Sequence, residues 1–67
     1  MIKLYTIDCP ACQVLEKKLI DKNISFEVVK DEAEFDRLKI DVFPVLEING
    51  QLMNYRNAVK WVNEYEN

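Results

Sequence analysis

The sequence predicts an α/β fold in which a four-stranded mixed sheet carries helices on both faces. Three observations lead to this prediction. Segments with strand and helix patterns follow one another in the order β-α-β-α-β-β-α. The pair Asn49-Gly50 is a strong signal for a tight hairpin, and 49% hydrophobic residues are enough to form a core in a chain of 67 residues. We expect a single domain over residues 1–67, without a linker, a repeat or a low-complexity segment.

The first part of the chain has the patterns of a strand, a helix and a second strand. Residues 2–7 are strand-like, and Pro10 suits the first position of a helix that runs to about residue 22. Alternating apolar residues predict the second strand over residues 24–29. The apolar stripe of the helix consists of Cys12, Leu15 and Leu19.

The middle of the chain has the pattern of a short helix followed by two strands. Asp31 and Glu34 form a capping box for a helix that ends near Leu38. Residues 45–48 are predicted to be the third strand. After the hairpin, residues 51–53 return antiparallel to it as the fourth strand.

The last helix is amphipathic, with Asn57 as its predicted N-cap. The two β-α-β connections favour parallel pairing of the first strands, and the hairpin adds antiparallel strands. The sheet is therefore expected to be mixed. The apolar face of the last helix consists of Ala58, Trp61, Val62 and Tyr65.

Composition and charge exclude several classes of function. The net charge is −3 and the nine basic residues are scattered along the chain, which argues against nucleic acid as the main partner. Without histidine, catalytic systems and metal sites that need an imidazole are excluded. The apolar runs are short, and the first residues lack the basic lead and long apolar core of a signal peptide. We expect a cytoplasmic monomer that binds neither nucleic acid nor membrane.

Cys9 and Cys12 are the two cysteines of the chain, and three interpretations apply to them. A structural disulfide that closes about four residues would stabilise the fold by only ~2 kcal/mol, and cytosolic proteins rarely keep such bonds. A zinc site would lack two of its four ligands. A redox-active pair fits best, because a strand precedes the pair and a helix follows it.

Local structure predicts different roles for the two sulfurs. Cys9 falls at the N-cap of the first helix, where unpaired N–H groups and the helix dipole favour its thiolate. Cys12 lies one turn later and faces inward, so that it can attack a mixed disulfide formed by Cys9. The carboxylate of Asp8, next to Cys9, is expected to oppose formation of the thiolate.

Four pieces of the sequence together resemble one known group of proteins, the thioredoxin-fold superfamily, and within it the small glutaredoxins and glutaredoxin-like redoxins. The resemblance covers nearly the whole chain and implies the thioredoxin fold. The four pieces are Cys9-Pro10-Ala11-Cys12, Val42-Phe43-Pro44, Asn49-Gly50, and Asn54-Tyr55-Arg56-Asn57 followed by Trp61-Val62.

By this resemblance the protein is expected to be a thiol-disulfide oxidoreductase. Cys9 is then the nucleophile and Cys12 the resolving cysteine, in a motif completed by Pro10 and Ala11. No bound cofactor or metal is expected, because the cysteines carry the electrons. The implied substrates are protein disulfides, with ribonucleotide reductase among the clients, and mixed disulfides of glutathione.

The resemblance also implies a substrate groove beside Pro44. This proline is expected to be cis and to face the disulfide, while Phe43 offers its backbone N–H and C=O to an extended substrate. We expect the side chain of Phe43 to be exposed, where it would help to dock a protein. Arg56 could pair there with a carboxylate. The expected substrate-binding residues are Val42, Phe43, Pro44, Tyr55, Arg56 and Asn57.

The electron donor is left open between glutathione and a flavoprotein thioredoxin reductase. Val42 and Phe43 stand where glutaredoxins usually have Thr-Val, Ala11 stands where they have an aromatic residue, and Met53-Asn54 replaces a Gly-Gly pair. These departures favour the reductase. Two further alternatives are a carrier in which the cysteine pair binds a soft ion such as Cu(I), and a domain that only binds partners.

Overall fold

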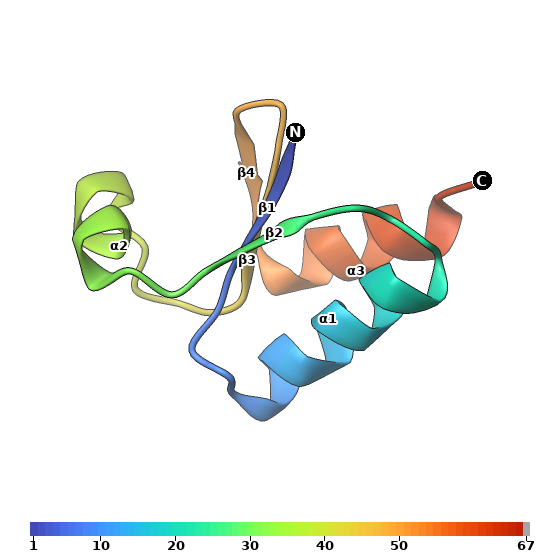
Figure 1. The fold of residues 1–67 in the computed structure, drawn as a ribbon, viewed down its shortest axis with the longest axis horizontal. Coiled ribbons are helices and arrows are strands. Elements are labelled where there is room, and N and C mark those ends of the chain that lie inside the picture. The colour runs from blue at the N-terminus through green and yellow to red at the C-terminus, as the bar shows by residue number, and fades with distance from the viewer. Residues whose placement is uncertain (67) are drawn as a thin grey trace.

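The computed structural model describes residues 1–66, so Asn67, the last residue of the domain expected over residues 1–67, lies outside the described part. Four strands and three helices follow one another in the predicted order (Figure 1). They are β1 (Ile2–Tyr5), α1 (Pro10–Asp21), β2 (Glu27–Val29), α2 (Glu32–Leu38), β3 (Val45–Ile48), β4 (Gln51–Met53) and α3 (Tyr55–Glu64).

The first two strands are shorter than predicted, and each shortening has a local cause. β1 ends before Asp8, whose backbone is left-handed with φ 59°, so the chain turns there towards α1. At the other end of α1, the Ile24 N–H donates to the Leu19 carbonyl at 3.0 Å. Ile24 therefore closes the helix instead of opening β2.

The sheet is mixed, with the strand order β2-β1-β3-β4. β1 pairs parallel with β2, as predicted, and β3 pairs antiparallel with both β1 and β4. The second β-α-β connection therefore does not produce a parallel neighbour. Tyr5 is the register partner of both Val29, where β2 ends, and Val45, where β3 begins. Because the chain re-enters the sheet at the end it has just left, β3 must run in the opposite direction.

The two faces of the sheet are covered unequally. In Figure 1 the sheet is seen nearly edge-on, with α1 and α3 on one side and α2 on the other. α1 and α3 share a continuous apolar core with the strands, whereas Phe35 is the one buried residue of α2. The buried core on the α1 and α3 side consists of Leu4, Leu15, Leu19, Ile24, Leu46, Ala58 and Val62.

Helix caps differ in detail from the prediction. Asn54, and not Asn57, is the N-cap of α3: its side-chain oxygen accepts the N–H of Asn57 at 2.8 Å. β4 ends at Met53 and α3 starts at once, so the first available Asn takes the cap. The predicted Asn49-Gly50 hairpin is confirmed, with φ values of 50° and 90°.

The capping box predicted for α2 forms only in part. Asp31 is the N-cap, and its carboxylate accepts the N–H of Ala33 at 2.9 Å. The side chain of Glu34 does not return to the cap, because its carboxylate is held by the guanidinium of Arg37 at 2.7 Å. Within residues 1–66, the helices are all too short or too polar to cross a bilayer.

Candidate active site

The two cysteines lie where the chain leaves β1 and enters α1. Cys9 is the N-cap of α1, in an extended conformation with φ −73° and ψ 165°, and its Sγ accepts the N–H of Cys12 at 3.2 Å. Pro10 is the first residue of the helix, as predicted. Cys9 is half-buried, whereas Cys12 is 1% exposed. Solvent thus reaches the sulfur of Cys9 but not the sulfur of Cys12, which lies behind it.

The pKa of the Cys9 thiol shifts in the direction opposite to the prediction. The hydrogen bond with the Cys12 side chain is the largest cause that raises the pKa of the Cys9 thiol. Burial raises the pKa of Cys12, but hydrogen bonds from Cys9, from Thr6 and from the Ile7 backbone outweigh it and lower that pKa. The two thiols therefore act on each other, with opposite effects on the two pKa values. The N-cap position by itself favours the Cys9 thiolate, but the neighbouring Cys12 thiol acts against it.

Thr6 is a member of this site that the sequence analysis missed. It is buried and directly follows β1, and its hydroxyl oxygen accepts the N–H of Asp8 at 3.0 Å. Its hydroxyl also lowers the pKa of Cys12 by a hydrogen bond. A polar residue placed between an apolar strand and a cysteine motif was the available signal.

Lys30 is the second residue that the sequence analysis missed. Its Nζ lies 2.9 Å from Oδ2 of Asp8, and the hydrogen bond and charge of Asp8 raise the pKa of Lys30. Asp8, which was expected to oppose the thiolate, therefore has a cation beside it. Because β1 and β2 are parallel and Tyr5 is level with Val29, the residues after both strands meet at one end of the sheet. The predicted parallel pairing could have revealed this contact.

The loop before β3 reaches the same end of the sheet. The peptide bond between Phe43 and Pro44 is cis, as the resemblance implied. Pro44 is buried, and because Val45 is the register partner of Tyr5, Pro44 lies level with Thr6 at the entrance to the cysteine loop. The cysteines and the cis-proline therefore lie at the same end of the sheet.

The prediction that the Phe43 side chain is exposed is wrong. The ring is half-buried and packs edge-on against Phe35 of α2, with ring centroids 4.6 Å apart. The exposed apolar side chain of this loop is that of Val42, at 68%. The prediction failed because it treated the loop in isolation, whereas α2 supplies an aromatic partner for Phe43.

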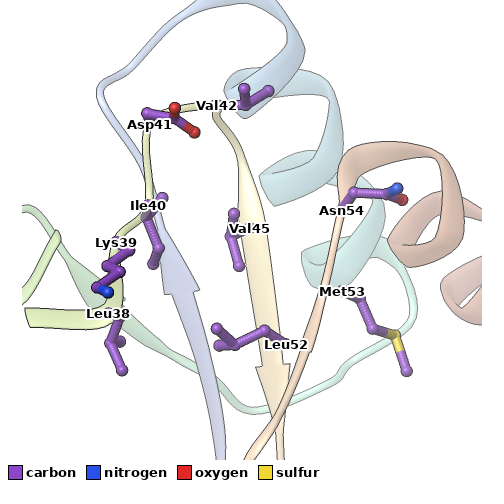
Figure 2. A pocket seen from close by; sticks show the side chains of 9 residues that line it. All are labelled: Leu38, Lys39, Ile40, Asp41, Val42, Val45, Leu52, Met53 and Asn54. Carbon is purple, nitrogen blue, oxygen red and sulfur yellow. The ribbon is translucent and has the colours of Figure 1, made fainter.

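A shallow apolar groove adjoins this loop on the α2 side of the sheet (Figure 2). Its volume is about 220 Å³, and it runs between the segment that follows α2 and the strands β3 and β4. Neither cysteine is among its lining residues. Its apolar lining is made mainly by Leu38, Ile40, Val42, Val45 and Leu52.

The remaining predicted groove residues lie at the start of α3. Tyr55 is half-buried and packs against the core shared by α1 and α3. Arg56 and Asn57 are exposed. Asn57 lines a separate hollow with Trp61, between α3 and β4. The role of these three residues in substrate binding stays a prediction.

The residues also bear on whether a metal could be held. Across residues 1–66, three or more His, Cys, Asp or Glu side chains nowhere gather in a geometry that could hold a metal ion.

Comparison with known proteins establishes the fold. No protein-family model matches the chain, and no curated protein matches its sequence. Among solved structures, the chain is similar to the glutaredoxin-like protein NrdH-redoxin from Escherichia coli, whose structure was described as the basis of a thioredoxin-like activity profile. The TM-score is 0.73 at 19% sequence identity, over 98% of this chain and 95% of that chain. The chain thus has the fold of that protein, the thioredoxin fold, as the resemblance implied.

Proposed function

We propose that the protein is a thiol-disulfide oxidoreductase that reduces disulfides through Cys9 and Cys12. One observation carries the proposal: the accessible sulfur of Cys9 caps α1 and accepts the N–H of Cys12, whose own sulfur is buried one turn later. This arrangement supplies an attacking sulfur that substrates reach and a second sulfur that they do not.

The reaction requires Cys9 as the thiolate and Cys12 as the thiol. The Cys9 thiolate attacks one sulfur of the substrate disulfide, forms a mixed disulfide and expels the other substrate sulfur as a thiolate. That thiolate takes the proton from Cys12. The Cys12 thiolate, still stabilised by Thr6 and the Ile7 backbone, then attacks Cys9 and expels the second substrate sulfur, which is protonated by solvent. Two electrons pass to the substrate and a Cys9–Cys12 disulfide remains.

The substrate is bound in an extended form beside the cis-proline. The backbone groups of Phe43 pair with it next to Pro44, and Val42 adds an exposed apolar contact. Tyr55, Arg56 and Asn57, at the start of α3, complete the substrate-binding set at the same end of the sheet.

The physiological substrates are protein disulfides, and ribonucleotide reductase is among the candidate clients. The protein acts in the cytoplasm, as a monomer without a bound cofactor. Thioredoxin reductase and glutathione are the candidate electron donors. The thioredoxin-like activity profile described for NrdH-redoxin supports the reductase, as does Ala11 in place of the aromatic residue usual in glutaredoxins.

The test is NADPH consumption by the oxidised protein and a model disulfide in two parallel arms. One arm contains thioredoxin reductase, and the other contains glutathione with glutathione reductase. We expect turnover in the first arm, its loss in Cys9→Ser, and accumulation of mixed disulfides in Cys12→Ser, detected by mass spectrometry. Turnover in the glutathione arm alone would reverse the choice of donor.

Two other outcomes would contradict the proposal itself. Full dithiol turnover by Cys12→Ser would remove the division of roles between the cysteines. Silence in both arms, together with tight binding of one Cu(I) ion by the reduced protein, would establish the soft-metal carrier in its place.

A further inference from the structure

Three aromatic rings connect the sheet, α2 and the loop before β3. Phe35 of α2 is 7% exposed. Its ring meets Tyr5 of β1 at a centroid distance of 6.4 Å and an interplanar angle of 69°. On its other side it meets Phe43 at 4.6 Å and 65°. Both contacts are edge-to-face, the arrangement that aromatic pairs prefer. We call Tyr5, Phe35 and Phe43 the aromatic row.

One end of the aromatic row is fixed in the sheet. Tyr5 is fully buried, and its hydroxyl donates to the Glu47 carboxylate of the neighbouring strand β3 at 2.6 Å. A side chain that is buried in β1 and hydrogen-bonded to β3 cannot shift without disturbing both strands. Phe35 therefore packs against a side chain that two strands hold in place.

The other end of the row is the residue that precedes the cis-proline. Within residues 1–66, no backbone hydrogen bond uses the N–H or the carbonyl of Phe43. The packing of its ring against Phe35 is therefore a contact that holds this residue in place. Since Phe35 packs against that ring, it is the contact through which α2 acts on the loop.

We propose that Phe35 is a positioning residue for the substrate-binding loop and makes the protein selective for extended polypeptide disulfides over small ones. By holding the Phe43 ring under α2, it keeps the backbone N–H and C=O of Phe43 aimed at the edge where Cys9 lies. The inference rests on the proposed function. A polypeptide that pairs with this backbone depends on the alignment, whereas a small disulfide needs only the Cys9 sulfur.

The test compares Phe35→Leu, Phe43→Leu and the double variant in reduction of insulin disulfides, with dithiothreitol as the recycling reductant. We expect each single variant to raise the KM for insulin about fivefold, the order of magnitude of one aromatic pair, while kcat stays within about twofold. The double variant should be no worse than either single variant, because Phe35 acts through Phe43. Phe26→Leu is the matched control: it makes the same change at a half-buried residue packed against the α1 and α3 core.

Two readouts separate positioning from general loosening of the fold. The rate constant for dithiobis(nitrobenzoate) and the pH profile of Cys9 alkylation by iodoacetamide should be the same in the wild type and Phe35→Leu, because Phe35 belongs to α2 and not to the cysteine loop. A loss of reactivity towards this small disulfide equal to the loss towards insulin would overturn the inference.

Further results would also overturn it. These are a fivefold rise in KM for Phe26→Leu, additive effects in the double variant, or an unchanged KM in Phe35→Leu when the wild type reduces insulin. The last result leaves the proposed function intact. If the wild type reduces insulin no faster than Cys9→Ser, the proposed function fails and this inference fails with it.

Discussion

The two faces of the sheet are built for different tasks. On the α1 and α3 side, both helices and the strands contribute to one core, so each buried residue is supported by several others. On the α2 side, a helix from Glu32–Leu38 is held mainly by Phe35. The first face gives the chain its stability. The α2 side has few buried contacts, and they connect α2 with the loop before β3. We therefore expect substitutions on the α2 side to change substrate binding more than stability.

The largest expected effect comes from removing a residue of the α1 and α3 core. Leu46→Ala should lower the free energy of unfolding by about 2–5 kcal/mol, because Leu46 is fully buried among leucines of α1 and β1. Leu52→Ala is the same change on the α2 side, at a residue that is 42% exposed, and should cost less than about 1 kcal/mol. Urea unfolding measures both. Equal costs would show that the two faces do not differ.

A smaller effect is expected from the base of the aromatic row at alkaline pH. Burial and the hydrogen bond to Glu47 raise the pKa of Tyr5 to about 12, above the value near 10 in the unfolded chain. The folded state therefore holds this proton more tightly, so its contribution is complete below pH 10 and is lost as the pH rises towards 12. The loss should amount to about 2–3 kcal/mol.

Comparison with Tyr5→Phe isolates this contribution from other groups that titrate in the same range. The variant should unfold more easily than the wild type at neutral pH and lose less stability between pH 10 and 12. Parallel curves for the two proteins over that range would show that Tyr5 is not the group responsible. The stability is followed by urea unfolding at each pH.

The smallest expected effect concerns the ion pair between Lys30 and Asp8, which belongs to neither face. Both side chains are more than half exposed, so Lys30→Gln should leave the stability nearly unchanged. It should slow alkylation of Cys9 at neutral pH by less than about threefold, since the charge of Asp8 then disfavours the thiolate.

Two further variants serve as controls for this effect. Lys17→Gln removes the exposed pair with Asp21 at the other end of α1 and should change nothing. Asp8→Asn in the Lys30→Gln background should restore the rate. A Lys30→Gln variant that reacts as fast as the wild type at low salt would remove Lys30 from the site.

The sequence predicted the features that depend on neighbouring residues. The order of elements, the Asn49-Gly50 hairpin and the N-cap position of Cys9 all follow from local patterns, and the cis form of Pro44 followed from the resemblance. The misplaced cap of α3 is a local error: Asn54 and Asn57 are equally good caps, and the end of β4 decides between them.

The features that the sequence did not predict depend on contacts between distant segments. Phe43 is half-buried because α2 brings Phe35 to it, and Lys30 reaches Asp8 because of the parallel register of two strands. The pKa shifts of Cys9 and Cys12 depend on Thr6 and on the neighbouring thiol, which helix geometry alone does not include.

The unequal exposure of the two sulfurs also governs how the protein meets oxidative damage. Hydrogen peroxide reaches Cys9 but not Cys12, which is 1% exposed, so oxidation to a sulfenic acid falls on the outer sulfur. The intact thiol one turn away condenses with it, water leaves, and the product is the same Cys9–Cys12 disulfide that the proposed reaction forms. The irreversible sulfinic and sulfonic forms are thereby avoided. The electron donor can then reduce the Cys9–Cys12 disulfide and restore both thiols.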